Sequence, residues 1–546
     1  MTTGQAGRRL LPWAIAVVAV ALAVSATSVG NGFTQDDVPI IAGNARVHEL
    51  GSILHRFAES YWPPEVGAVL YRPLAMVAYT VEWAVGRGEP WAFHLTSWAL
   101  AAALAGVLLL LFRELLPPVA AGAAALLFAV HPVHTEAIGG VVGQADLWVA
   151  LALAWATLLY LRGRQAQRLG RNRWAAIVAL AAAAVFTKEN GAVLLGLLAA
   201  VELTVVRDPH PLGSRLRHLW PGYAACALVV LAYVAARIAV LGGLVGEIPH
   251  VSIRTAGLGE RVLTMLPVVI EWLRLLFLPA HLQSDYMPQE LAAASGFGAG
   301  QLLGLLALVG TAWLAWRTRR SAPVVTLGVA WMGVTLFPVS NLAVRTGILL
   351  AERTLLVPSI GAVLVAVGLV EWRLRVGPVP SPAERRVAWA AFGMLLAVAG
   401  AWHAVRLRVW RDNPTLYAQT VLDAPLSYKA HWAQAGMLYR TGQLAEAQAE
   451  YRTALQLFTD DPNLLEDYAD RYIEHGRCME ALPWLRAAIA AGPTLYKARS
   501  KLVLCLIQVD SLPAARAAMA AKAEAKDPDL AFLSRQLDTI LTPRAP

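Results

Sequence analysis

Eleven long apolar stretches dominate the first 404 residues and constrain the fold of this chain more than any other feature. About 20 apolar residues span the hydrocarbon core of a membrane. Lipid offers the backbone no hydrogen-bond partners, so such spans form helices. The chain is 57% hydrophobic and only 15% charged, which is atypical of a soluble enzyme. We therefore predict an all-α fold whose residues 1–404 form a polytopic membrane bundle of about eleven transmembrane helices. The stretches are 11–30, 91–112, 118–133, 146–162, 174–187, 190–206, 218–241, 299–316, 323–340, 354–372 and 386–404.

Charged residues interrupt two apolar segments, one among the eleven stretches and one outside them. Lys188-Glu189-Asn190 breaks the run 174–206, which predicts a tight hairpin whose turn dips toward the membrane. Segment 262–280 carries Glu271 and Arg274, which favours an interfacial or re-entrant helix over a full span.

The basic residues indicate how the bundle is oriented. With eleven alternating spans, the Arg-rich stretches 162–173, 207–217 and 373–386 fall on one side, and basic loops are retained in the cytoplasm. The N-terminus is therefore predicted to be cytoplasmic, residues 31–90 to contain the first external loop, and the C-terminal region to lie outside. The first span lacks a convincing cleavage site, which favours a retained signal anchor. The Ala- and Arg-rich, Lys-poor composition is typical of a high-GC bacterium and so favours a bacterial inner membrane.

Residues 405–546 form a separate region without long apolar runs. Four positions recur 34 residues apart, which is the tetratricopeptide period. A third, degenerate copy has Asp510 and Ala515 at matching positions. We predict an α-solenoid of about three repeats, whose short groove either holds a few residues of extended peptide or serves as simple spacing. The recurring residues are Gly442, Ala447, Tyr451 and Ala454, followed by Gly476, Ala481, Leu485 and Ala488.

Net charge and cysteines add two expectations. The net charge of +9 belongs to the basic loops, where orientation explains it, so no nucleic-acid partner is predicted. Cys226 lies within a span, whereas Cys478 and Cys505 lie in the repeats. Their helix-packing positions favour buried free thiols over a disulfide, and their spacing matches no metal site.

The adjacent carboxylates Asp36 and Asp37 follow the first apolar stretch, where the chain emerges into water. One of them can serve as a catalytic base, because repulsion between neighbouring carboxylates raises one apparent pKa. The pair can also hold a divalent ion, although no complete ligand set accompanies it. The alternative is a solvated loop end.

Other polar residues lie at the predicted outer edge, where ionisable groups are costly and mark functional sites. Arg72, beside Pro73, is a candidate phosphate ligand. His94 is either a ligand contact or an interfacial histidine. His134 and Glu136 end the third span. Pro132 keeps His131 and His134 off one helical face and the motif HExxH is absent, which disfavours zinc hydrolysis.

Asp146 and two more pairs complete the candidate set. Asp146 follows a glycine-rich stretch at the start of the fourth span. Lys188 and Glu189 either contact a ligand or neutralise each other. Glu352 and Arg353 open the tenth span, where they either grip a phosphate or form a helix-end ion pair.

Ordered motifs along the whole chain resemble a known family. FTQDD, YRPL, WAFH, HPVHTEAIGGVVGQAD, FTKENG and AERTLLVPSIG, followed by the repeats, are similar to the transmembrane and tetratricopeptide repeat-containing (TMTC) family and its bacterial relatives. The resemblance implies a C-type (GT-C) glycosyltransferase fold, a polyprenyl-phosphate sugar donor and inversion at the sugar; the animal members are associated with O-mannosylation of protein Ser/Thr. Gln144 departs from the pattern, which has Arg in a GRAD-like string.

The residue chemistry assigns roles within that implication. Asp36 or Asp37 takes the proton of the acceptor hydroxyl, and Arg353, Arg72 and Lys188 bind the donor phosphate. Glu352, His134 and Glu136 position the sugar or a cation, and the spans hold the prenyl tail. The exported acceptor protein binds in the repeat groove.

The predicted function is therefore an integral membrane glycosyltransferase acting outside the cytoplasm on protein Ser/Thr. The alternatives are transfer to a glycan or lipid, and a non-catalytic membrane scaffold whose repeats recruit a partner. A transporter is a weaker reading, because no inverted repeat or paired broken helices stand out.

Overall fold

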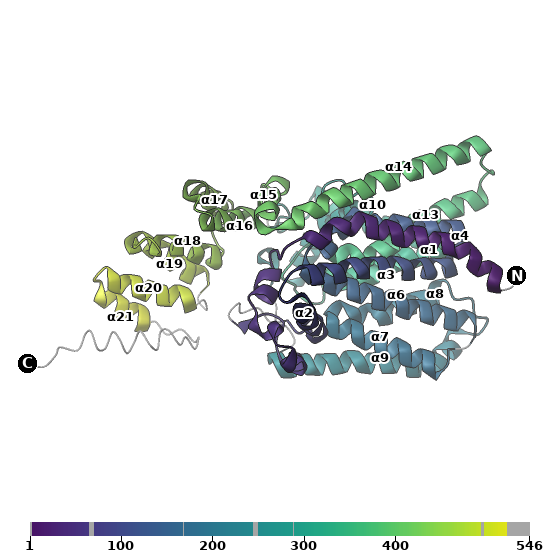
Figure 1. The fold of residues 1–546 in the computed structure, drawn as a ribbon, viewed down its shortest axis with the longest axis horizontal. Helices are drawn as coiled ribbons and strands as arrows, with labels where there is room; N and C mark the ends of the chain where they lie inside the picture. The colour runs from purple at the N-terminus through teal and green to yellow at the C-terminus, as the bar shows by residue number, and fades with distance from the viewer. Residues whose placement is uncertain are drawn as a thin grey trace, which may run out of the picture. The chain divides into compact units, whose positions relative to one another are not determined.

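The structure is a computed structural model that describes residues 3–64, 70–167, 169–243, 249–287, 289–492 and 496–520. Every regular element in these ranges is a helix, which confirms the predicted all-α class. The chain divides into two compact units, Met1–Ala424 and Pro425–Pro546 (Figure 1).

Seven helices in the described ranges are long and apolar enough to cross a membrane, and the number is eight if a bent pair of helices counts as one span. The pair joins α4 (Pro118–Ala129) to the segment Pro132–Gly139, with a bend of 46°. The first unit is thus the multi-span part of an integral membrane protein. The seven long helices are α1 (Thr3–Ser25), α3 (Trp91–Leu115), α6 (Gln144–Gln165), α9 (Leu212–Leu241), α11 (Ala299–Thr318), α13 (Leu356–Val376) and α14 (Pro382–Leu407).

All eleven predicted stretches fall on helices, but three of these helices are shorter than a full span. They are α7 (Arg171–Thr187), α8 (Leu194–Thr204) and α12 (Pro323–Leu336), with 17, 11 and 14 residues. Between α7 and α8 the chain turns at Lys188 and η8 (Glu189–Val193), so the predicted hairpin is present. Segment 262–280 forms most of α10 (Leu258–Phe277).

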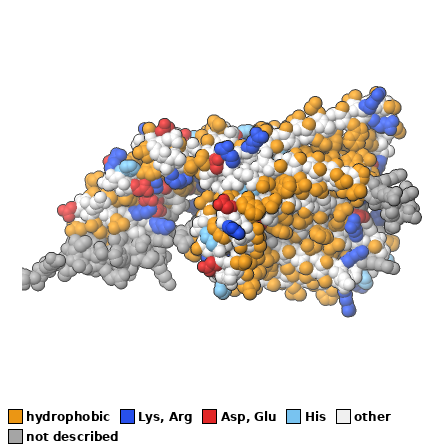
Figure 2. All heavy atoms as spheres, in the orientation of Figure 1, with side chains coloured by type: hydrophobic (Ala, Val, Ile, Leu, Met, Phe, Trp, Pro, Cys, Tyr) orange, Lys and Arg blue, Asp and Glu red, His pale blue; other side chains and the backbone are white. Residues whose placement is uncertain are grey.

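Small residues let the helices of the bundle pack closely. A Cβ atom on Gly328 would lie 2.6 Å from the carbonyl oxygen of Gly361, and one on Gly361 would lie 2.5 Å from that of Gly328. The backbones of α12 and α13 therefore meet directly at this point, as small residues allow in membranes. On the face in Figure 2, apolar side chains cover the flank of the bundle, whereas charged side chains lie toward its ends.

Short elements fill one end of the bundle, where the predicted site residues lie. Asp37 precedes η2 (Val38–Ala42), and Arg72 precedes α2 (Pro73–Gly86), whose proline takes the first helical position. The remaining short elements are η1 (Ala26–Gly30), η3 (Ala45–His48), η4 (Leu50–Ala58), η6 (Pro132–His134), α5 (Thr135–Gly139), η7 (Val141–Gly143), η9 (Val251–Ile253), η10 (Phe337–Val339), η11 (Glu352–Leu355), η12 (Arg408–Arg411) and α15 (Asn413–Asp423).

The second unit consists of three helical hairpins with the predicted period. Each hairpin turns at a residue in the left-handed region, with φ of 81° at Gly442, 71° at Gly476 and 58° at Asp510. Asp510 stands where the other two repeats have glycine, which identifies the degenerate third copy. The six helices are α16 (Tyr428–Arg440), α17 (Leu444–Leu457), α18 (Pro462–Ile473), α19 (Cys478–Ala491), α20 (Tyr496–Gln508) and α21 (Leu512–Ala520).

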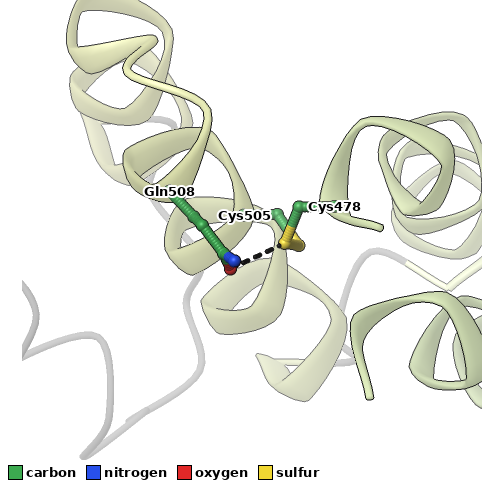
Figure 3. Close-up of a disulfide and its surroundings, with 3 residues drawn as sticks. All are labelled: Cys478, Cys505 and Gln508. Atoms are coloured by element: carbon green, nitrogen blue, oxygen red, sulfur yellow. Dashed lines mark hydrogen bonds between the residues drawn. A yellow bond between two sulfur atoms is a disulfide. The ribbon is translucent and has the colours of Figure 1, made fainter. Parts of the chain in front are cut away.

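The prediction of free thiols in the repeats is wrong. Cys478 at the start of α19 and Cys505 in α20 form a disulfide, with their Cα atoms 5.1 Å apart (Figure 3). This Cα separation lies within the range that a disulfide requires. Helix-packing positions did bury both cysteines, but they also brought them face to face across neighbouring repeats, which spacing along the sequence does not reveal. Cys226 is a buried free thiol, as predicted.

Candidate active site

Asp37 is fully buried and ties two loops together. Its carboxylate accepts hydrogen bonds from the backbone N–H groups of Thr34 at 3.0 Å, Val141 at 3.1 Å and Val142 at 2.8 Å. Burial raises the pKa of Asp37 from 3.8 to about 6, although these N–H groups oppose the rise. The carboxylate thus fixes the first external loop to the glycine-rich stretch that precedes α6.

Asp36 has the opposite environment. Its side chain is partly exposed, and within the part of the chain that the structure describes its carboxylate makes no hydrogen bond or ion pair. The preceding Gln35 has a φ of 46°, which is uncommon for a residue other than glycine and typical of functional sites. The two adjacent acids therefore differ in their capacity to accept a hydrogen bond from a ligand. Both carboxylate oxygens of Asp37 already accept backbone hydrogen bonds, whereas the carboxylate of Asp36 has no partner among the described residues.

Glu136 and Arg353 form the first of three ion pairs beside these acids. Glu136, in α5, accepts a hydrogen bond from the backbone N–H of Arg353 at 2.8 Å and also pairs with its guanidinium group. Only 4% of the Glu136 side chain is exposed, against 26% of the Arg353 side chain. Arg353 is therefore held from one side and remains accessible from the other.

Asp146 and Lys188 form a buried pair. The ammonium group of Lys188 lies 2.7 Å from both carboxylate oxygens of Asp146. Both side chains are almost inaccessible, with exposed fractions of 5% for Asp146 and 7% for Lys188. The predicted alternative, a Lys188–Glu189 pair, is not what forms, because each of these neighbours bonds a different partner.

Arg72 and Glu189 form the third pair. The guanidinium group donates two hydrogen bonds to the Glu189 carboxylate, at 3.0 and 2.5 Å. Burial alone would raise the pKa of Glu189, but the positive charges of Arg72 and Lys188 outweigh it and hold this pKa at about 2. Arg72 also lies over the ring of Tyr61, 5.1 Å from its centroid.

The three pairs and Asp36 form one electrostatic group. The charges of Glu136, Asp36 and Asp146 act on Arg353, and those of Asp146, Arg72, Arg353 and Glu189 act on Lys188. We call this group the ion-pair cluster. It holds three cations and four carboxylates, of which only Asp36 lacks a cationic partner among the described residues. Its members are Asp36, Arg72, Glu136, Asp146, Lys188, Glu189 and Arg353.

Three predicted site residues make other, buried contacts. His94 lies 3.2 Å from the carbonyl oxygen of Gly32, and His134 lies 2.8 Å from the hydroxyl of Ser359. Glu352 accepts hydrogen bonds from the backbone N–H of Gln283 at 2.5 Å and from the hydroxyl of Tyr286 at 2.9 Å. These three side chains position neighbouring segments, and each is at most 2% exposed.

Tyr61 is a neighbour of the cluster that sequence reasoning missed. It is buried under Arg72, and burial raises its pKa to about 12, so its hydroxyl stays protonated. The only signal was an aromatic residue in the first external loop, which is too common to single out. Gln144, the departure from the family pattern, donates a hydrogen bond to the carbonyl of Phe93 at 3.2 Å and lies beside the buried Glu82.

The cluster does not resemble a metal site. Among the described residues, no group of three or more His, Cys, Asp or Glu side chains is arranged to hold a metal ion. The three buried or partly buried carboxylates with partners each face an Arg or Lys, which supplies the positive charge that a metal ion would otherwise bring.

The chain is similar to a set of animal proteins over most of its length. It is 26% identical to protein O-mannosyl-transferase TMTC4 of Mus musculus over 81% of this chain, and 26% identical to protein O-mannosyl-transferase Tmtc3 of Drosophila melanogaster over 79%. A stretch covering 52% of the chain is 30% identical to protein O-mannosyl-transferase Tmtc2 of Drosophila melanogaster. The chain is thus similar to proteins of the TMTC family over most of its length. No protein-family profile matches it.

This chain matches only part of each relative. The matched region covers 66% of mouse TMTC4, 53% of Drosophila Tmtc3 and 32% of Drosophila Tmtc2. The chain thus spans about half to two thirds of the length of the first two relatives.

Proposed function

We propose that this protein is a membrane glycosyltransferase that transfers a sugar, mannose by analogy with its relatives, from a polyprenyl-phosphate donor to Ser or Thr hydroxyls of proteins outside the cytoplasm. The relatives that support this proposal are named protein O-mannosyl-transferases. The observation that carries it is Asp36, an open carboxylate within electrostatic reach of the partly exposed Arg353.

Asp36 is the proposed base. It accepts the proton of the acceptor hydroxyl while the hydroxyl oxygen attacks the anomeric carbon of the sugar. The bond between that carbon and the phosphate oxygen breaks, and the polyprenyl phosphate leaves with the bonding electron pair. A positioned base typically contributes about 10²–10⁴-fold to such a step. Asp37 is not the base in this proposal, because both of its oxygens already accept backbone hydrogen bonds.

Arg353 is the proposed partner of the leaving phosphate. Its guanidinium group presents planar donors suited to phosphate, and Glu136 orients it while a quarter of the side chain stays exposed. Arg72 and Lys188 add positive charge to the same cluster. Glu189 holds Arg72, and Asp146 holds Lys188. Preorganised charges of this kind stabilise developing negative charge without reorganising during the reaction.

The disulfide of the second unit supports the proposed side of the membrane. Disulfides persist in oxidising compartments such as the periplasm, and Cys478–Cys505 lies in the repeat unit. We propose that this unit faces the same compartment as Asp36 and that its groove receives the acceptor protein.

The test measures transfer of radiolabelled sugar from a panel of polyprenyl-phosphate donors to exported protein in membranes that contain the wild type, Asp36→Asn or Asp37→Asn. We expect the wild type to label protein, and Asp36→Asn to lose at least about 10²-fold of that rate with an unchanged unfolding midpoint. Asp37→Asn should lower both the rate and the midpoint, because it disturbs the loop contacts.

Two outcomes would overturn the proposal. If no donor labels protein in correctly inserted wild type, the chain is better explained as a membrane scaffold that recruits partners through its repeats. If labelling persists in Asp36→Asn, the protein is a transferase but Asp36 is not its base.

A further inference from the structure

A second charged site lies at the end of the bundle opposite the ion-pair cluster. It lies where α3, α6 and α8 end and α12 begins, and it encloses a cavity of about 360 Å³. This volume lies within the range of about 300–1,000 Å³ that small-molecule pockets occupy. The cavity is lined by Glu114, Leu115, Leu161, Arg164, Gln165, Gln167, Val205, Val206, Arg207, Pro323 and Val324.

Arg164 is the buried cation of this cavity. Its Nε and Nη2 donate to Glu202 at 2.9 Å each, and Nη2 also donates to Asp208 at 2.6 Å. Only 8% of its side chain is exposed. A guanidinium group carries five N–H donors, so these bonds leave the two on Nη1 without a partner among the described residues. Arg164 is thus rigidly held and still has donors to offer to a ligand in the cavity.

The neighbouring charges leave this end positive. Glu202 is shared between Arg164 and Arg215, whose Nε lies 2.8 Å from its carboxylate, and Glu114 is paired with Arg162 at 2.7 Å. Arg207, which lines the cavity and is exposed, has no ion pair among the described residues. Four arginines therefore face three carboxylates, and the surplus cation lies at the cavity.

The lining has two chemically distinct parts. Arg164, Arg207 and two glutamines supply hydrogen-bond donors, whereas leucine, valine and proline side chains form the remainder. Arg162 Nε donates to Oε1 of Glu114, so the other carboxylate oxygen, Oε2, has no donor among the described residues. A ligand that fits carries an anionic phosphate for the arginines, a hydroxyl for Glu114 and an apolar portion.

We propose that this cavity binds the headgroup of an anionic glycerophospholipid, with its phosphodiester at Arg164 and Arg207 and its acyl chains directed along the apolar wall. A membrane lipid is favoured over free phosphate because the lining is half apolar and belongs to helices of a membrane bundle. Basic pockets between helices on the side that carries the basic loops are suited to such headgroups.

The test uses the full chain, delipidated in a neutral detergent, with phosphatidylglycerol as the probe and native mass spectrometry as the readout. We expect one phosphatidylglycerol to remain bound to the wild type at activation energies that strip the others. Arg207→Ala should weaken this binding at least about tenfold, as expected for loss of a charged hydrogen bond. Val206→Trp should abolish it by filling the cavity without changing any charge.

The matched control is Arg217→Ala. It removes an exposed arginine near the start of α9, close to Arg207 in the chain, that does not line the cavity. It should bind like the wild type. The proposal fails if Arg207→Ala and Val206→Trp retain phosphatidylglycerol, or if phosphatidylcholine binds the wild type equally well. It also fails if inorganic phosphate alone binds the wild type as strongly as the lipid does. Neither variant touches the ion-pair cluster, so this result is independent of whether the protein transfers sugar.

Discussion

The two ends of the bundle both bury arginines and carboxylates, but they use them differently. At one end Glu202 accepts hydrogen bonds from Arg164, Arg215 and the hydroxyl of Tyr160, so the acid is fully bonded. At the other end the ion-pair cluster satisfies three carboxylates with three cations and leaves Asp36 open. The Glu202 network fixes helix ends, whereas the cluster presents one reactive acid.

This difference shows that burial of charge does not by itself identify a catalytic site. Buried ion pairs are retained for positioning as well as for chemistry. The two ends differ in which group has no partner among the described residues. At one end it is the Asp36 carboxylate near Arg353, and at the other it is the N–H donors of Arg164 and Arg207. We therefore expect mutations to affect stability at the Glu202 end and reaction rate at the Asp36 end.

Removing Glu202 should have the largest effect on stability. Glu202→Ala leaves Arg164 and Arg215 without their shared acid, and loss of one partner from a buried ion pair typically costs about 3–5 kcal/mol. Thermal unfolding in detergent should show a large drop in midpoint. Asp36→Ala is the control, since it removes a carboxylate that has no partner in the described part of the chain and should leave the midpoint unchanged. A similar drop in both variants would contradict the contrast between the ends.

Exchanging arginine for lysine at each end of the bundle tests the same contrast, because it keeps the charge and changes the geometry of the hydrogen-bond donors. Arg353→Lys keeps the charge but loses the planar fork, and we expect transfer to slow by about 10²–10³-fold, the usual cost of losing one preorganised donor. Its unfolding midpoint should change little. Arg164→Lys should behave in reverse, with a lower midpoint and a normal rate per folded molecule. Equal slowing of transfer by both variants would show that the two ends are coupled.

The fold could be predicted largely from the sequence, because long apolar runs and a 34-residue period leave few alternatives. Lipid forces helices wherever some 20 apolar residues follow one another, and all eleven stretches are helical. Three of them are short, because α7, α8 and α12 end where Thr187, Thr204 and Leu336 give way to turns or tighter helices. The predicted stretch 174–187 has the same end as α7, whereas the predicted stretches extend beyond the ends of α8 and α12.

The candidate site could be predicted as a set of residues but not as a set of partners. The pairing of Asp146 with Lys188 joins residues 42 positions apart, and that of Glu136 with Arg353 joins residues 217 apart. Such pairs depend on how the helices pack. For the same reason the sequence could not distinguish Asp36 from Asp37, whose difference arises from the N–H groups of Val141 and Val142.

Asp37 predicts a pH dependence of stability at the end of the bundle that holds Asp36. Its pKa is about 6 in the folded protein and close to 3.9 in an unfolded chain. The folded state therefore binds this proton more tightly, so its contribution to stability is present at low pH and is lost as the pH rises from about 4 to about 6, by up to about 3 kcal/mol. Unfolding midpoints between pH 4 and 7 should fall in the wild type. In Asp37→Asn this part of the slope should vanish, and an unchanged slope would assign it to another group.

The smallest expected effect concerns Gln144, the position that departs from the family pattern. Burial raises the pKa of the neighbouring Glu82 to about 8, and Glu82 Oε2 and Gln144 Oε1 have no hydrogen-bond partner among the described residues. In the wild type, Glu82 should therefore lower stability as the pH rises from about 4.5 to about 8. Gln144→Arg places a cation beside this carboxylate, lowers its pKa and should flatten that slope, with a net change in stability of only about 1 kcal/mol because desolvation offsets most of the attraction. Gln144→Leu removes the amide, whose hydrogen bond lowers the pKa of Glu82, and adds no charge, so it should keep or steepen the slope. If Gln144→Arg also keeps the slope, Glu82 does not face position 144 in the folded protein. An arginine at this position, as in the family pattern, would then have no buried acid as its partner.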